Sequence, residues 1–149
     1  MHMKPTPGGA QPADVTAETW FRATTAVTSV NAQLGAWLTE RHRVSLSEYR
    51  ALRYLSTMPD LEARVSELAH RIDLNQSSVT RLLGRLEARG LTRRDLCSED
   101  GRGVYAVLTD AGQALVRDAR EPFLAQLERA LQDAGDLRHE LDTLLPAAD

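Results

Sequence analysis

The sequence predicts a mainly α-helical chain with one small β-hairpin, and three observations support this. Apolar residues recur at helical spacing along most of the 149 residues. The spacing becomes strand-like only after Gly90, where two short runs flank a polar, glycine-containing loop. Serine, threonine or asparagine stands where several of the helices should begin. The expected order is therefore helix, helix, helix-turn-helix, hairpin wing, helix, helix.

Length and composition suit one globular domain, because 42% of the residues are hydrophobic and can bury a core. No apolar run reaches about 18 residues, so no membrane span is expected. Residues 1–16 contain prolines and glycines without an apolar stretch, and we expect a flexible arm rather than a secretory signal. A single cysteine, Cys97, excludes an internal disulfide and favours a reducing cytoplasm.

The first two helices are indicated by their spacing and by a start signal. From about residue 17 to residue 39, tryptophan, valine and leucine recur at helical spacing, and the polar stretch Glu40–Arg43 ends the pattern. Ser45 can then accept a hydrogen bond from the amide of Glu48, while the Glu48 carboxylate reaches back to Ser45. This capping box predicts a second helix, which stops before Pro59.

Two short helices follow in close succession. The second runs from about residue 76 to residue 89, with Asn75 as its N-cap and Gly90 just beyond its end. Only Asp73-Leu74-Asn75 separates the two helices, which is typical of a helix-turn-helix. The apolar residues of the second helix, expected to face inward, are Val79, Leu82, Leu83 and Leu86.

The hairpin and the last helices complete the chain. Leu91–Cys97 and Val104–Leu108 are expected to be its two strands. Thr109 then caps a long helix that contains Pro122, a position where it could kink, and Gly135 breaks the chain before a terminal helix. The outer helices are too apolar for a monomer, so we expect them to pair with those of a second copy.

The outward face of the second short helix is polar and suits the major groove of DNA. Small hydroxyl and amide side chains leave backbone amides for a phosphate, and arginine can bind guanine edges or phosphates. An ordinary solvated helix face is the alternative. The residues of this face are Gln76, Ser77, Thr80, Arg81, Gly84 and Arg85, and Ser78 lies near its edge.

The predicted hairpin follows this helix in the chain, and its basic residues also favour DNA binding. Although the formal net charge is −3, the segment from Arg64 to Arg102 holds eight arginines and six acidic residues. Arg102 stands between two glycines at the predicted tip, where a basic side chain could enter the minor groove. Asp100 could hold its guanidinium in a bidentate pair. A basic hairpin directly after a helix-turn-helix is expected to be a DNA-binding wing.

Three stretches of the chain resemble the MarR family (multiple antibiotic resistance regulators) in order and spacing. They are Ser66-Glu67-Leu68-Ala69, the helix from Ser78 to Leu91, and the wing from Glu99 to Arg102 with Leu108-Thr109-Asp110-Ala111-Gly112. The wing loop departs from the family pattern, since it lacks the usual proline and Gly103 stands where a second basic residue is frequent.

The resemblance implies a winged helix-turn-helix over residues 45–108, flanked by dimerisation helices over residues 17–44 and 109–149. It further implies a homodimer that binds a pseudo-palindromic operator in double-stranded DNA as a transcriptional regulator, in the main a repressor. The expected DNA-binding residues are Ser66, Asn75, Gln76, Ser77, Ser78, Thr80, Arg81, Arg85, Arg94, Asp100 and Arg102.

Family members commonly respond to small aromatic or phenolic ligands that bind between the dimerisation helices and the DNA-binding lobe. Aromatic side chains of the first two helices are candidates for such a pocket, and core packing is the preferred alternative for them. The candidates are Trp20, Trp37, His42, Tyr49 and Tyr54. Redox sensing through Cys97 is a weaker hypothesis, because some relatives sense peroxides through a cysteine near the first helix instead.

Other classes of function have less support. A winged-helix module for protein–protein contact is the main alternative, but such modules tend to lose the cations that this chain keeps. No phosphate loop, nucleophile elbow or catalytic spacing of carboxylates and histidines occurs, so we do not expect an enzyme. The histidines are too far apart in sequence for a metal pair, and neither a metal nor another cofactor is expected.

Overall fold

The computed structural model describes residues 8–9, 11–96 and 103–145. Its elements in chain order are α1 (Pro12–His42), α2 (Leu46–Thr57), a 3₁₀ turn η1 (Pro59–Leu61), β1 (Glu62–Arg64), α3 (Val65–Arg71), α4 (Gln76–Ala88), β2 (Thr92–Leu96), β3 (Val104–Leu108), α5 (Asp110–Asp133) and α6 (Leu137–Leu144). The predicted fold class, mainly α with a small hairpin wing, is confirmed.

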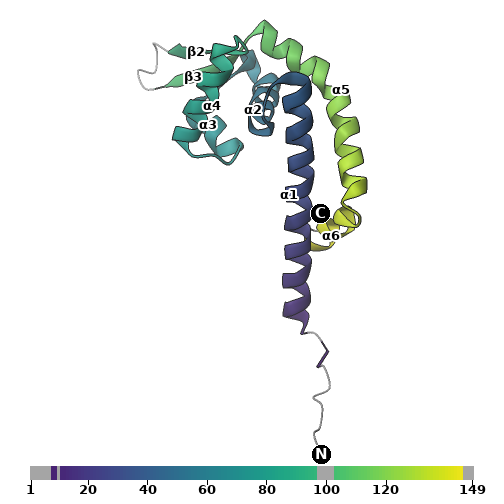
Figure 1. Cartoon of the computed structure of the whole chain (residues 1–149). Helices are drawn as coiled ribbons and strands as arrows, with labels where there is room; N and C mark the ends of the chain where they lie inside the picture. The colour runs from purple at the N-terminus through teal and green to yellow at the C-terminus, as the bar shows by residue number, and fades with distance from the viewer. Residues whose placement is uncertain (1–7, 10, 97–102, 146–149) are drawn as a thin grey trace, which may run out of the picture.

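The helices form a stalk with a lobe beside one end of it (Figure 1). α1 is the stalk, α5 runs alongside it, and α6 lies against it farther from the lobe. The lobe holds α2, α3, α4 and the hairpin, and it lies to one side of the end of α1 where that helix stops. The lobe therefore contains the predicted helix-turn-helix and wing, while α1, α5 and α6 form the part to which the sequence assigns dimerisation.

Helix α1 is longer than the sequence analysis expected, and part of the predicted arm is wrong. The expected start was residue 17, whereas the helix begins at Pro12. Proline suits the first helical position, because its fixed φ fits a helix and its missing N–H has no partner there in any case. The hydroxyl of Thr16 donates to the carbonyl of Pro12, and that of Thr19 donates to the carbonyl of Val15. The first turn was not predicted because residues 12–16 contain one large apolar residue, Val15, and so show no helical spacing of apolar side chains.

The predicted capping box at the start of α2 is present. The amide of Glu48 donates to Ser45 Oγ at 3.1 Å, and the amide of Ser45 donates to Glu48 Oε2 at 3.2 Å. Val44 and Tyr49 are both buried, as the apolar pair that accompanies such a box should be. These contacts fix where the chain leaves α1 and enters the lobe.

Replacing Ser45 by alanine should lower the free energy of unfolding by about 1 kcal/mol, because the Glu48 amide would lose its side-chain acceptor. Urea denaturation at a fixed protomer concentration measures this change. Ser29→Ala, at an exposed position inside α1, is the control and should not destabilise the protein. Equal stability of the Ser45 variant and the wild type would mean that water replaces the cap without loss.

The sheet contains a strand that the sequence analysis missed. Its strand order is β1-β3-β2, and both pairs are antiparallel. β1 has only three residues, in which Ala63 opposite Ala106 is the buried one. Three residues are too few to show an alternating pattern. By pairing with β3, β1 ties the start of α3 to the base of the hairpin.

The lobe is held together by apolar side chains from all of its helices. The four residues of α4 predicted to face inward, Val79, Leu82, Leu83 and Leu86, are all buried. They belong to a continuous core with Leu52, Leu55 and Leu68 from α2 and α3. Each such leucine contributes about 1.5–3 kcal/mol by leaving water. Burial of this face fixes which side of α4 is left outside.

Candidate nucleic-acid interface

The outer face of α4 is exposed, polar and capped as predicted. Asn75 Oδ1 accepts the amide of Ser78 and the hydroxyl of Ser77, each at 2.8 Å. Gln76, Ser77 and Thr80 are exposed beyond this cap. The first amides of a helix have no acceptor within the helix, and they carry its positive dipole end. The first turn of α4 can therefore approach a phosphate or a base edge closely.

Four predicted DNA-binding residues meet in one hollow between α4 and the wing. This wing-side hollow has a volume of about 250 Å³. Its lining includes Ser66 of α3, Gln76 and Thr80 of α4, and Arg94 of β2. Arg94 Nε lies 3.1 Å from Glu87 Oε2 of α4, which holds the guanidinium beside the hollow. The hollow thus joins polar groups from the two helices of the helix-turn-helix and from the first strand of the wing.

Arg64 also lines the wing-side hollow, although the sequence analysis did not include it among the DNA-binding residues. Its Nε donates to the hydroxyl of Tyr105 at 3.1 Å, and its guanidinium lies 5.7 Å from the centre of that ring. The pairing of β1 with β3 places these two residues opposite each other. Because β1 has no periodic signal of its own, the sequence pattern did not connect Arg64 to the wing.

A second hollow of about 250 Å³ lies on the other side of α4, against the start of α2. Arg81, exposed, and Ser78, partly buried, line it together with Ser45 and Ser47. Within the described part of the chain, no ion pair is recorded for Arg81, in contrast to its neighbour Arg85. Arg81 is therefore the arginine of α4 with its guanidinium most available to a ligand.

Arg85, predicted to bind DNA, also makes an ion pair within the protein. Its Nε lies 3.0 Å from Oε1 of Glu48, which is only 7% exposed and belongs to the α2 capping box. The Arg85 side chain is still 60% exposed, so the rest of its guanidinium reaches solvent. Arg85 both bridges α4 to α2 and keeps donors on the outer face. The bridging role of Glu48 was missed because its sequence signal was that of a cap alone.

The predicted wing tip lies outside the described residues, and this includes Asp100 and Arg102 as well as Cys97. The described part of the wing is basic and exposed along β2, where Arg93 and Arg94 are followed by Asp95. The assignment of Arg102 to the minor groove stays a prediction.

The aromatic residues proposed to line a ligand pocket are not all brought together. Trp37 contacts His42 with ring centres 5.4 Å apart, and Phe123 of α5 lies 4.7 Å from Tyr49 and 6.4 Å from Trp37. Burial raises the pKa of Tyr49 above its usual value of 10.0. Tyr54 instead stacks against Arg71, with 5.8 Å between ring centre and guanidinium carbon. Trp37, His42 and Tyr49 therefore form a packed cluster.

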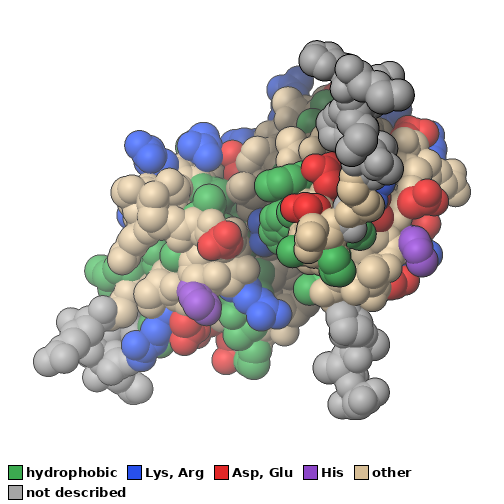
Figure 2. Space-filling view, turned by 90° about the horizontal axis from the view of Figure 1, so that it is seen from below, with side chains coloured by type: hydrophobic (Ala, Val, Ile, Leu, Met, Phe, Trp, Pro, Cys, Tyr) green, Lys and Arg blue, Asp and Glu red, His purple; other side chains and the backbone are tan. Residues whose placement is uncertain are grey.

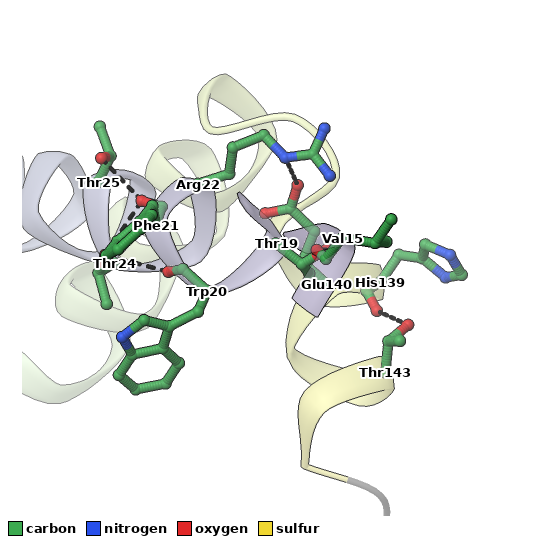
Figure 3. A network of polar contacts seen from close by, with 10 residues as sticks. All are labelled: Val15, Thr19, Trp20, Phe21, Arg22, Thr24, Thr25, His139, Glu140 and Thr143. Carbon is green, nitrogen blue, oxygen red and sulfur yellow. Dashed lines mark hydrogen bonds and ion pairs between the residues drawn. The ribbon is translucent and has the colours of Figure 1, made fainter. Parts of the chain in front are cut away.

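Trp20, the fifth of these residues, lies far along α1 from that cluster. Its side chain is 52% exposed and projects away from α6, whereas Arg22 two residues later points to α6 and pairs with Glu140 (Figure 3). Trp20 and the packed cluster thus occupy separate parts of the molecule.

The described residues offer neither a cluster of metal ligands nor a helix suited to a membrane. They contain no group of three or more histidine, cysteine, aspartate or glutamate side chains that could hold a metal ion. None of their helices is long and apolar enough to cross a membrane.

Comparison with known proteins finds one family repeatedly. Residues 44–103 match the sequence model of the MarR family. The homoprotocatechuate degradative operon repressor of Escherichia coli is 32% identical over 93 residues, which are 62% of this chain and 59% of that repressor. The chain thus spans less than two thirds of the length of that relative.

Solved structures match over more of the chain. A MarR transcription factor from Planctomyces limnophilus is 31% identical with a TM-score of 0.68, covering 89% of this chain and 96% of that one. AbsC, a MarR family transcriptional regulator from Streptomyces coelicolor, is 26% identical with a TM-score of 0.77, covering 93% of each chain. The similarity therefore includes the helices on both sides of the helix-turn-helix.

Proposed function

Because this chain belongs to the MarR family, we propose that it is a DNA-binding transcriptional regulator that recognises a pseudo-palindromic operator as a homodimer. The observation that supports this most is the exposed polar face of α4 beside the wing-side hollow. We also propose a cytoplasmic location, which a chain with one cysteine favours.

In this proposal α4 enters the major groove with its N-terminal half first. Gln76 and Thr80 face base edges, where an amide can pair with adenine and a hydroxyl can contact several bases. Arg81 donates to a guanine edge or a phosphate, and Arg94 and Ser66 bind phosphates beside the groove. Phosphate contacts fix the position of the protein on the duplex, and base contacts provide the sequence preference.

The apolar surface of the stalk supports the homodimer. Phe21 is 60% exposed and Trp20 52%, and both lie on the part of α1 farthest from the lobe. Seen from that end, the molecule exposes apolar side chains among the acidic and basic ones (Figure 2). A monomer seldom leaves several large apolar side chains together in water. Two-fold pairing through the stalk would cover them and present two α4 helices to one duplex.

Phe21→Asp should raise the dissociation constant of the dimer about tenfold or more, since each dimer would bury two new carboxylates at its interface. Sedimentation equilibrium over a range of protein concentrations measures this constant. Leu96→Asp is the matched control, because Leu96 is 75% exposed on the wing and far from the stalk. If both variants dimerise like the wild type, the dimer interface lies elsewhere.

Repression is the regulatory direction that we propose, and the name of the E. coli relative supports it. A repressor acts by occupying its operator, and this requires no contact with another protein. The alternative, a winged-helix module for protein contact, would not need the exposed arginines on α4 and β2.

We further propose control by a small aromatic or phenolic acid. A hollow of about 460 Å³ between α2 and α5 supports a position for it outside the packed aromatic cluster. Arg53, Arg117 and Arg120 line this hollow and could pair with a carboxylate. Calorimetric titration with benzoate and salicylate tests this, and binding lost in a variant with Arg53→Gln and Arg120→Gln is expected. Full binding by that variant would contradict the position.

Selection of bound sites from a random duplex library, carried out at two salt concentrations, tests the proposed function. The expected product is one inverted-repeat motif whose affinity falls steeply as salt rises, because phosphate contacts release counterions. Absence of any motif at both salt concentrations would favour the protein-contact module.

A further inference from the structure

The C-terminal end of α4 is joined directly to the C-terminal end of α1 by one side chain. Arg89, the residue that ends α4, donates from Nη1 to the carbonyl of Arg43 at 2.5 Å and from Nη2 to the carbonyl of His42 at 3.1 Å. Among the described residues, these hydrogen bonds are the ones that link the end of α4 to the end of α1. We call this pair of contacts the Arg89 clamp.

The Arg89 clamp lies at the C-terminal end of α1, where backbone carbonyls have no hydrogen-bond donor within the helix. The last carbonyls of a helix have no donor within it and carry its negative dipole end. α1 ends at His42, and Arg43 follows in the left-handed conformation with φ 56°. This turn directs the two carbonyls to one side, where a planar guanidinium can bond both at once. A lysine has a single ammonium group and lacks this fork.

A second contact holds α4 one turn earlier. Arg85 pairs with the buried Glu48 at the start of α2, as described above. The C-terminal half of α4 is thus attached to α2 by Arg85 and to α1 by Arg89, while its N-terminal half carries the polar face for DNA. Because Val79, Leu82 and Leu86 are buried in the lobe, α4 and the lobe move together, and the Arg89 clamp is where α4 is attached to α1.

The length of α4 determines how far a small tilt at its clamped end moves its first turn on DNA. α4 has 13 residues and is therefore about 20 Å long. A tilt of about 10° at the clamped end would move the first turn by roughly 3.5 Å, which is close to the rise of one base pair. In a dimer paired through α1, such a tilt changes the separation of the two α4 helices, which must match about 34–36 Å on DNA.

We infer that Arg89 is a positioning residue that sets the spacing of the two half-sites this protein accepts. The inference rests on the proposed function and adds a determinant of specificity that touches no base. Loss of the clamp lets the lobe, and α4 with it, tilt relative to α1, so that operators one base pair too short or too long become acceptable. Loss of a phosphate contact, in contrast, would weaken binding to all spacings alike.

The experiment uses the full chain and three duplexes that carry the selected inverted repeat with its spacer shortened by one base pair, unchanged, or lengthened by one. We expect the wild type to prefer the unchanged spacer about 30-fold or more. We expect the preference to fall below about fivefold in R89Q and in R89K. R89K keeps the positive charge, so a loss of preference there reports on the fork and not on the charge. R138Q is the matched control, because Arg138 is exposed on α6, away from the DNA-binding lobe, and pairs with Glu128 instead.

Three results would overturn the inference: equal weakening on all three duplexes with the preference kept, no change in either Arg89 variant, or a wild type without spacer preference. Hydrogen exchange measured without DNA distinguishes failure of this inference about Arg89 from failure of the proposed function. Amides of residues 38–44 and 85–91 should exchange about tenfold faster in R89Q than in the wild type, even if no duplex is bound. Unchanged exchange in these segments would show that the clamp does not hold the helices together.

Discussion

Arg81→Ala is expected to weaken binding to the selected operator about 100-fold. Arg81 is exposed on the outer face of α4, and among the described residues it has no acidic partner such as Arg85 has in Glu48. A bidentate arginine contact to guanine contributes about 1–3 kcal/mol, and a two-fold dimer would lose two of them. Titration of labelled operator with protein, read by fluorescence anisotropy at fixed salt, measures the change.

The control for Arg81 is Arg138→Ala in α6, which removes the same charge at the other end of the molecule. Arg138 pairs with Glu128 near the surface, so its loss should leave operator affinity within about twofold. The salt dependence adds a second readout. If Arg81 contacts phosphate, the slope of log affinity against log salt falls in the variant, whereas a base contact relaxes the preference for one base pair. An Arg81 variant that binds like the Arg138 variant would place the DNA contact elsewhere.

Gly112→Ala is expected to lower the free energy of unfolding by about 2 kcal/mol, although alanine is the better helix former. Gly112 is buried in the first turn of α5, where its amide donates to the Thr109 hydroxyl at 3.1 Å. A methyl group there would collide with the carbonyl oxygen of Leu91 and the side chain of Leu108. The Leu91 carbonyl cannot move freely, because it accepts the amide of Thr109. Overpacking of about 3 kcal/mol outweighs a helix-propensity gain of about 1 kcal/mol.

Gly84→Ala in α4 is the matched control for Gly112→Ala, because it makes the same substitution inside a helix. A Cβ at Gly84 meets no atom within 4 Å, so only the helix propensity remains and the variant should gain up to about 1 kcal/mol. Urea denaturation without DNA, at equal protomer concentrations, compares both variants with the wild type. A stability of Gly112→Ala equal to that of the wild type would mean that α5 shifts on the lobe without loss.

The sequence predicted those parts of the fold whose signals are local. The Ser45 capping box, the Asn75 and Thr109 caps and the inward face of α4 each depend on residues within one or two turns, and the structure contains all of them. Gly90 and Gly135 both have positive φ, as expected of residues that follow a helix. Helix α5 runs through Pro122 as one element.

Features that depend on residues far away in the sequence could not be predicted from local sequence patterns. β1 exists because β3 lies beside it, and three residues carry no periodic signal of their own. The contacts of Arg85 with Glu48 and of Arg89 with the end of α1 join residues 37 to 47 positions apart. From sequence alone, these arginines were indistinguishable from others on a polar helix face. Packing within the lobe brings Arg85 to Glu48, and packing of the lobe against α1 brings Arg89 to the end of that helix.

The most direct test of the central claim, that the outer face of α4 occupies the major groove, is methylation of guanine N7 in the selected operator with and without protein. N7 is a major-groove atom, so a bound α4 should protect guanines in two patches whose centres lie about one helical turn apart. Arg81→Ala should lose part of this protection at protein concentrations that still saturate the duplex. Saturated binding that leaves every guanine N7 as reactive as in free DNA would contradict the claim.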